Sequence, residues 1–108
     1  MNPQITEITN SLRGSLSEIY GDKLHNVLLY GSYARGTQTE GSDIDIAVVL
    51  KGDIFKTAEI NRMLDIVTDL NLKYNVLVSV YPVSEQELVK VNSPILINLR
   101  QEGIAVGQ

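Results

Sequence analysis

The sequence predicts an α/β fold in which a small mixed β-sheet is flanked by helices. Two long segments, residues 5–19 and 54–72, carry apolar residues at steps of three and four, the period of an amphipathic helix. Three short apolar segments have the length and the flanking residues of strands. Only the first two strands are close enough in sequence to form a hairpin, so a mixed sheet is expected. The length of 108 residues suits one domain over residues 1–108.

The first half of the chain predicts a helix, two strands and the loop between them. The helix is expected to end near Gly21. Its apolar stripe consists of Ile5, Ile8, Leu12, Leu16 and Ile19. A short buried strand is expected over residues 26–30, and a second strand over residues 43–50. Residues 32–42 are rich in Gly, Ser and Thr and predict a loop with one helical turn near residues 33–35.

A second long helix and a third strand are expected next. The helix is predicted over residues 54–72. Its apolar stripe consists of Ile60, Met63, Leu64, Val67 and Leu70. The third strand is predicted over residues 75–81, because Pro82 lacks the N–H that a strand inside a sheet needs.

Two short helices and an edge strand complete the prediction. Ser84 and Glu87 have the spacing of a capping box, so a short helix should begin there. The Ser-Pro pair at residues 93–94 is a typical start for another helix, which is expected to end near Gly103. Residues 104–106 are predicted to add an edge strand.

The composition restricts the classes of function. The formal net charge of −4 makes broad nucleic-acid binding unfavourable, although an acidic protein can bind a nucleotide through metal ions. The absence of cysteine excludes disulfides and thiolate zinc sites and fits a reducing cytoplasm. No apolar run has membrane-spanning length, and residues 1–10 lack the pattern of a secretory signal. A cytoplasmic protein without a membrane partner is therefore expected.

The turn at Gly31-Ser32 is a candidate phosphate site. It follows a predicted strand and precedes a helical turn, whose free N–H groups and dipole favour an anion. Glycine permits a close backbone approach, and the serine hydroxyl can donate one more hydrogen bond. The alternative interpretation is an ordinary tight turn with a helix cap.

Asp43 and Asp45 are a candidate metal-binding pair. Residues two apart on a strand share a face, and this pair leads directly into the apolar run at residues 46–50. Two neighbouring carboxylates at the edge of a core repel each other and are costly to desolvate, and a divalent cation removes that conflict. In the alternative interpretation, Asp43 caps a backbone N–H and Asp45 is solvated at the end of the sheet.

The sequence resembles the G-S-x10-D-x-D signature of the polymerase-β-like nucleotidyltransferases. It has Gly31-Ser32, then ten residues, then Asp43-Ile44-Asp45. The length and element order are similar to the minimal nucleotidyltransferases (MNT), the antitoxins of HEPN/MNT toxin–antitoxin pairs. The resemblance implies a nucleotidyltransferase-like fold. It also implies that Gly31 and Ser32 hold the triphosphate and that Asp43 and Asp45 are catalytic and bind one or two Mg²⁺ ions.

Arg35 and Ser42 extend the resemblance, because the signature often includes an Arg-Gly after the turn and a Ser before the first Asp. Both are therefore candidate nucleotide-binding residues. For Arg35, contact with phosphate and a surface ion pair with Glu40 or another acid are equally compatible with the sequence.

The sequence departs from this family at a third carboxylate, which usually lies on a later strand and can accept the proton of the attacking hydroxyl. The predicted third strand contains neither Asp nor Glu. Its polar residues Asn75 and Ser79 are the candidates for the third-carboxylate region, and neither is a useful general base at neutral pH. This puts catalysis in question, but not nucleotide binding.

Two functions follow from these observations. The first is a Mg²⁺-dependent enzyme that transfers a nucleoside monophosphate, AMP from ATP, to a hydroxyl and releases pyrophosphate. The resemblance implies that the acceptor is a tyrosine of a HEPN-type toxin partner. The alternative is a catalytically weakened or inactive nucleotide-binding antitoxin or scaffold that acts by binding its partner. An RNA-end transferase is disfavoured by the acidic charge.

Overall fold

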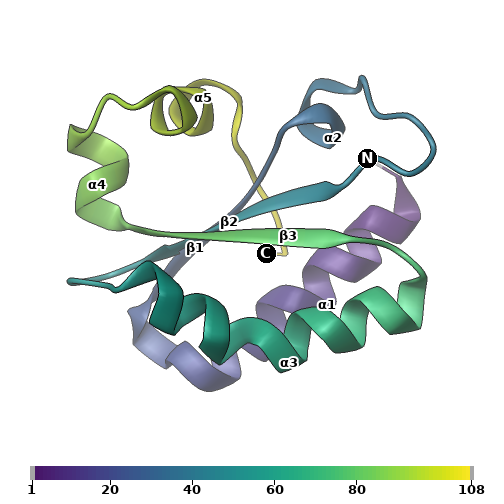
Figure 1. Ribbon diagram of the computed structural model, residues 1–108, viewed down its shortest axis with the longest axis horizontal. Helices are drawn as coiled ribbons and strands as arrows, with labels where there is room; N and C mark the ends of the chain where they lie inside the picture. Colours follow the sequence, from purple (N-terminus) through teal and green to yellow (C-terminus); the bar gives the residue numbers. More distant parts are fainter. Residues whose placement is uncertain (1, 108) are drawn as a thin grey trace.

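A mixed four-stranded sheet lies at the centre of the molecule, with helices on both of its faces (Figure 1). The computed structural model describes residues 2–107 and confirms the predicted α/β class. In chain order, the elements are α1 (Pro3–Tyr20), η1 (Gly21–Lys23), β1 (Leu24–Tyr30), α2 (Ser32–Arg35), β2 (Ile44–Leu50), α3 (Lys56–Tyr74), β3 (Val78–Ser84), α4 (Glu85–Lys90), α5 (Pro94–Glu102) and β4 (Ile104–Ala105).

The strands follow the order β3-β2-β1-β4 across the sheet. β1 is antiparallel to both β2 and β4, whereas β2 and β3 are parallel and are connected through α3. Because β3 is an edge strand, it accommodates Pro82 and continues to Ser84, so the expectation that Pro82 ends the strand is wrong. The strand begins at Val78. Asn75 is the left-handed C-cap of α3 and lies outside β3, contrary to the prediction.

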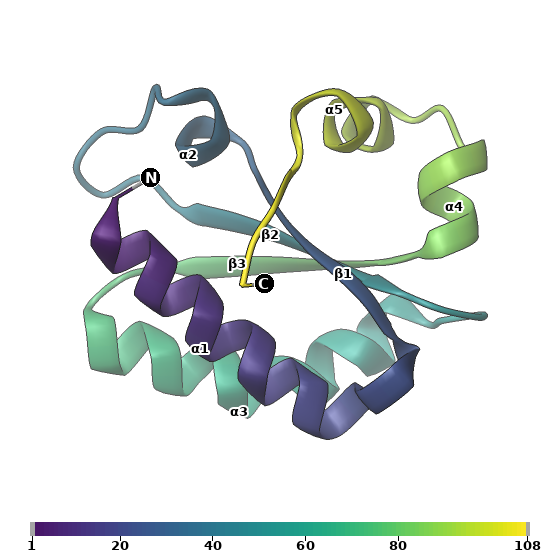
Figure 2. The same ribbon diagram turned by 180° about the vertical axis from the view of Figure 1, so that it is seen from behind.

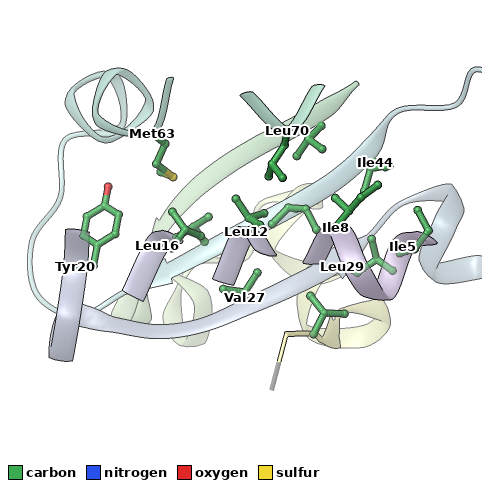
Figure 3. Packing of buried hydrophobic residues seen from close by; sticks show 14 of the residues in the cluster. Ile5, Ile8, Leu12, Leu16, Tyr20, Val27, Leu29, Ile44, Met63 and Leu70 are labelled. Atoms are coloured by element: carbon green, nitrogen blue, oxygen red, sulfur yellow. The ribbon is translucent and has the colours of Figure 1, made fainter. Parts of the chain in front are cut away.

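α1 and α3 cover one face of the sheet, as Figures 1 and 2 show from opposite sides. Figure 3 shows apolar side chains of α1 and α3 packed with those of β1 and β2. The stripe predicted for α1 is confirmed from Ile5 to Leu16, but its last member is wrong. Ile19 is 42% exposed, and Tyr20 is buried instead because it continues the four-residue step from Leu16.

The buried side of α3 is rotated relative to the predicted stripe. Met63 and Leu70 are buried as expected, but Ile60 and Leu64 are exposed. Glu59 takes a buried position instead, and its carboxylate accepts a hydrogen bond from the Tyr20 hydroxyl at 2.8 Å. An acidic residue can occupy this buried position because its charge has polar partners. The spacing of apolar residues in the sequence gives no information about such partners.

The other face of the sheet carries α2, α4 and α5 (Figure 1). α4 and α5 begin where predicted, since the Ser84 and Ser93 hydroxyls accept from the N–H groups of Glu87 and Leu96. The apolar residues of this face form a second, smaller cluster that includes Leu28, Ala47 and Leu99. Within residues 2–107, no helix combines the length and apolar character needed to cross a membrane.

Candidate active site

The turn after β1 has the geometry that a phosphate site needs. Gly31 has φ 74° and ψ −152° and is the N-cap of the short helix α2. Its carbonyl accepts from the N–H groups of Ala34 and Arg35, both at 3.1 Å. The N–H groups of Ser32 and Tyr33 have no protein acceptor within residues 2–107. They are therefore available to an anion at the start of α2.

Gly31 also lies directly against Asp45. A Cβ atom at position 31 would collide with the Asp45 carboxylate, so this position excludes side chains on steric grounds as well as by its positive φ. The hairpin register explains the approach, because Tyr30 pairs with Asp45 across the antiparallel β1 and β2 strands. The Gly-Ser turn and the aspartate strand thus meet at one end of the sheet.

Asp43 and Asp45 occupy different environments. Asp43 is exposed and immediately precedes β2, whereas Asp45 is half-buried within the strand. Burial raises the pKa of Asp45, and the neighbouring Asp43 charge raises it further, while the Arg35 charge lowers it. The two carboxylates are thus electrostatically coupled. Hard oxygen donors of this kind fit Mg²⁺, and Asp43 and Asp45 are the residues that could hold it.

Arg35 forms an ion pair with Glu102 at the end of α5, with 3.3 Å between Nη1 and Oε2. The surface ion pair of the sequence-based alternative is therefore present, with Glu102 and not Glu40 as the acid. Both side chains are about half-exposed, so the pair is weak and its arginine can exchange partners. Arg35 also acts on the site electrostatically, because its charge opposes the rise in the pKa of Asp45.

Ser42 organises the loop that precedes β2. Its hydroxyl accepts from the Thr39 N–H at 2.9 Å, and its own N–H donates to the Thr39 carbonyl at 3.0 Å. These bonds close a turn directly before Asp43. The structure therefore gives Ser42 a structural role in the loop, and nucleotide contact by Ser42 stays a prediction.

Ser79 is the residue of β3 that lies beside Asp45, because the two are paired in the parallel register. Asn75 is outside the strand, so only one of the two predicted candidates for the third-carboxylate region has this placement. Within residues 2–107, no group of three His, Cys, Asp or Glu side chains has the arrangement of a metal site. The acidic part of the site therefore consists of Asp43 and Asp45.

Tyr30 is a site residue that sequence reasoning missed. It pairs with Asp45 from the other side, so Tyr30, Asp45 and Ser79 form a row across three strands. Burial, then the Asp45 charge and then Tyr81 raise the pKa of Tyr30 to about 12, so its hydroxyl is neutral at physiological pH. Alignment of the two strand segments around the loop could have indicated this pairing.

Comparison with known proteins yields a consistent match. The profile of a family described as "Nucleotidyltransferase domain" matches residues 10–102. Two relatives from Methanocaldococcus jannaschii, both named "Putative protein adenylyltransferase", are 36% and 34% identical over 100 and 89 residues. These matches cover 92% and 82% of this chain and 90% and 87% of the relatives. A toxin–antitoxin crystal structure with AMP-PNP superimposes with a TM-score of 0.59 at 25% identity, covering 89% of this chain and 70% of that chain.

Proposed function

The chain belongs to the nucleotidyltransferase domain family, and we propose that it transfers AMP from ATP to a hydroxyl acceptor. The acceptor oxygen forms a bond to the α-phosphorus, and the bond from that phosphorus to the oxygen bridging to the β-phosphate breaks. Pyrophosphate leaves with the electron pair of the broken bond, and the acceptor proton passes to solvent. The observation that best supports this proposal is the close contact of the Gly31 turn with Asp45, which joins an anion site to a carboxylate pair.

Each residue of the site has a role in this proposal. The free N–H groups at the start of α2 and the Ser32 hydroxyl bind the triphosphate, and Arg35 leaves Glu102 to neutralise phosphate charge. Asp43 and Asp45 would hold Mg²⁺, as one ion or two. Bound Mg²⁺ would supply positive charge that stabilises the attacking and leaving oxygens.

We further propose that the acceptor is a tyrosine of a HEPN-type toxin partner and that this chain is the antitoxin. The similarity to a toxin–antitoxin structure with AMP-PNP supports a toxin partner and an adenine nucleotide.

A second candidate is a nucleotide-binding antitoxin that acts by contact and has little or no transferase activity. The specific observation in its favour is Ser79, which stands beside Asp45 where a carboxylate could complete the site. The two candidates differ in one measurable property. The enzyme releases pyrophosphate when an acceptor is present, whereas the binding module retains ATP unchanged.

The experiment that tests the proposal is calorimetric titration of ATP with Mg²⁺ into the protein and into the Asp43→Asn/Asp45→Asn variant. Metal-dependent binding that this variant loses is the expected result. The matched control is Asp65→Asn/Asp69→Asn, which removes two charges from exposed positions of α3 and should bind as the wild type does. Absence of ATP binding by the folded wild-type protein would contradict an autonomous nucleotide site.

Catalysis is tested with ATP labelled at the α-phosphate, incubated with the protein and a co-expressed toxin partner. The expected result is transfer of the label to the toxin, and loss of that label when the acceptor tyrosine is changed to phenylalanine. Binding of ATP and of the toxin without any label transfer would favour the non-catalytic antitoxin.

A further inference from the structure

Glu102 occupies a position that is electrostatically unfavourable for an acid. It is the last residue of α5, where the unpaired carbonyl groups of the helix carry partial negative charge. Arg100, the cation in the same helical turn, donates instead to the carbonyls of Leu88 and Val91, both at 2.8 Å. Within residues 2–107, the ion-pair partner of Glu102 is Arg35, the last residue of α2. The pair therefore joins the C-terminal ends of two helices that are far apart in sequence.

The contact between Arg35 and Glu102 is loose. One guanidinium nitrogen lies 3.3 Å from one carboxylate oxygen, whereas strong charge-assisted hydrogen bonds are about 2.7–2.9 Å long and are often formed in pairs. The two side chains are 48% and 36% exposed, so water competes for both charges. A group with more negative charge and more acceptor oxygens than a single carboxylate would displace Glu102 from the guanidinium.

Arg35 is also placed where a phosphate group would bind. It belongs to the same short helix as Ser32 and Tyr33, whose N–H groups have no protein acceptor within residues 2–107. The rise of an α-helix puts Arg35 about 4.5 Å along the axis from Ser32, a distance that an arginine side chain spans. One rotation of this side chain would thus exchange Glu102 for an anion at the start of α2.

We propose that Glu102 is an autoinhibitory residue that competes with the triphosphate for Arg35. This inference rests on the nucleotide site of the function proposed above. In the empty site, the Glu102 carboxylate takes the place of a phosphate group on the guanidinium. The triphosphate must displace Glu102, so the protein binds nucleotide more weakly than the same site would without this residue. Because such coupling is reciprocal, bound nucleotide weakens the link between α2 and the end of α5 by the same factor.

A double-mutant cycle tests the competition by calorimetry with ATP and Mg²⁺. Glu102→Gln should bind ATP about two- to fivefold more tightly than the wild type, the factor expected when an exposed ion pair no longer has to be broken. Arg35→Ala should bind ATP more weakly, and adding Glu102→Gln to Arg35→Ala should give no further gain. The matched control is Glu40→Gln, which removes an exposed charge from the loop between α2 and β2. Glu40 has no ion pair within residues 2–107, so this variant should bind ATP as the wild type does.

Nuclear magnetic resonance of the Glu102 carboxyl carbon reports the exchange of partners directly. Saturating ATP with Mg²⁺ should move the Glu102 Cδ resonance of the wild type to its position in Arg35→Ala, where the ion pair is absent. A resonance that stays in place when ATP binds would overturn the competition, because Arg35 would then hold Glu102 and the nucleotide together.

The titrations separate this inference from the proposed function. Equal ATP affinity of the wild type and Glu102→Gln would overturn the role of Glu102 and leave the nucleotide site intact. A gain from Glu102→Gln that persists without the Arg35 guanidinium would also overturn it, because simple repulsion between Glu102 and phosphate would then be the cause. Absence of ATP binding by the wild type and by Glu102→Gln, with both folded by circular dichroism, would overturn the nucleotide site and this inference together.

Discussion

The two faces of the sheet use the same strands for different purposes. Among residues 2–107, fifteen buried residues form one apolar cluster on the face covered by α1 and α3, whereas the opposite face has a cluster of six. β2 contributes to both faces, because Ile44, Ile46 and Val48 alternate with Asp45 and Ala47. The larger cluster therefore supplies most of the stability, and the opposite face can carry charged groups at one end.

The difference between the two faces explains why a half-buried carboxylate is tolerated inside a strand of this small protein. The residues on either side of Asp45 are fully buried on the α1/α3 face and fix the strand in place. The energetic cost of placing Asp45 next to Asp43 is small compared with that burial. Substitutions on the α1/α3 face should therefore change stability, and substitutions at the site end of the other face should change ligand binding.

Leu12→Ala is expected to have the largest effect on stability. Leu12 is fully buried in the larger cluster, so its truncation should lower the free energy of unfolding by about 2–5 kcal/mol, measured by urea denaturation. ATP affinity of the protein that remains folded should not change. Leu99→Ala is the matched control on the other face and should cost less because its cluster is smaller. Equal losses in the free energy of unfolding for the two variants would contradict the conclusion that the α1/α3 face supplies most of the stability.

Gly31→Ala should have the second-largest effect on stability, because it disturbs both the site and the backbone conformation. Its φ of 74° with ψ of −152° is accessible essentially to glycine alone, so alanine should cost about 1–3 kcal/mol. The new methyl group also displaces the Asp45 carboxylate, and calorimetry should show loss of ATP binding.

Gly36→Ala is the control for Gly31→Ala at the other end of α2. Gly36 has a similar φ of 75° but lies in the ordinary left-handed region, and a Cβ atom there would meet open space. This variant should lose some stability and retain ATP binding. Loss of ATP binding in both variants would mean that strain in α2, and not the contact with Asp45, decides binding.

The fold was largely predictable because its helices carry local signals. The capping residues Ser84 and Ser93 and the apolar steps of α1 are properties of short segments, and they appear in the structure where they were expected. The errors arose where distant residues decide the outcome. Glu59 is buried because Tyr20 donates to it from another helix, and Pro82 is tolerated because β3 lies at the edge of the sheet.

The candidate site was predictable only in part, for the same reason. The spacing of Gly31 and Asp45 indicated that the turn and the acidic strand belong together, and the structure places them in contact. Tyr30 and Ser79 become neighbours of Asp45 only through the register of three strands, and Arg35 meets Glu102 across 67 residues of sequence. Periodicity within one segment contains no information on such pairings.

Tyr20→Phe tests a polar contact within the otherwise apolar α1/α3 face. This contact is the buried hydrogen bond from Tyr20 of α1 to Glu59 of α3. Removal of the hydroxyl leaves the Glu59 carboxylate, which is 4% exposed, without its 2.8 Å hydrogen bond. The expected cost is about 1–3 kcal/mol in the free energy of unfolding, with ATP affinity unchanged. Tyr74→Phe is the control, because the Tyr74 hydroxyl has no protein hydrogen bond within residues 2–107. Equal costs for both variants would argue against the Tyr20–Glu59 link.

Asp45→Asn should have the smallest effect on stability and the opposite sign. Burial and the Asp43 charge raise the pKa of Asp45, so its ionised form is less favourable in the folded protein than in the unfolded chain. In metal-free buffer at neutral pH, the asparagine variant should therefore be more stable, by less than about 1 kcal/mol because solvent screens the pair. Thermal denaturation with a chelator present measures the difference.

The pH dependence of the stability gained by Asp45→Asn shows whether the ionised carboxylate causes the difference. Since the penalty belongs to the ionised form, the difference between Asp45→Asn and the wild type should be full at neutral pH and should disappear as the pH falls through the raised pKa of Asp45. Asp43→Asn removes the repulsion but not the cost of burial, so it should give a smaller gain. Mg²⁺ should then reverse the order, because only the wild type keeps both carboxylates to bind it. A wild type that is more stable than Asp45→Asn without metal would mean that Asp45 supports the fold, and the separation of the two faces would not hold at this residue.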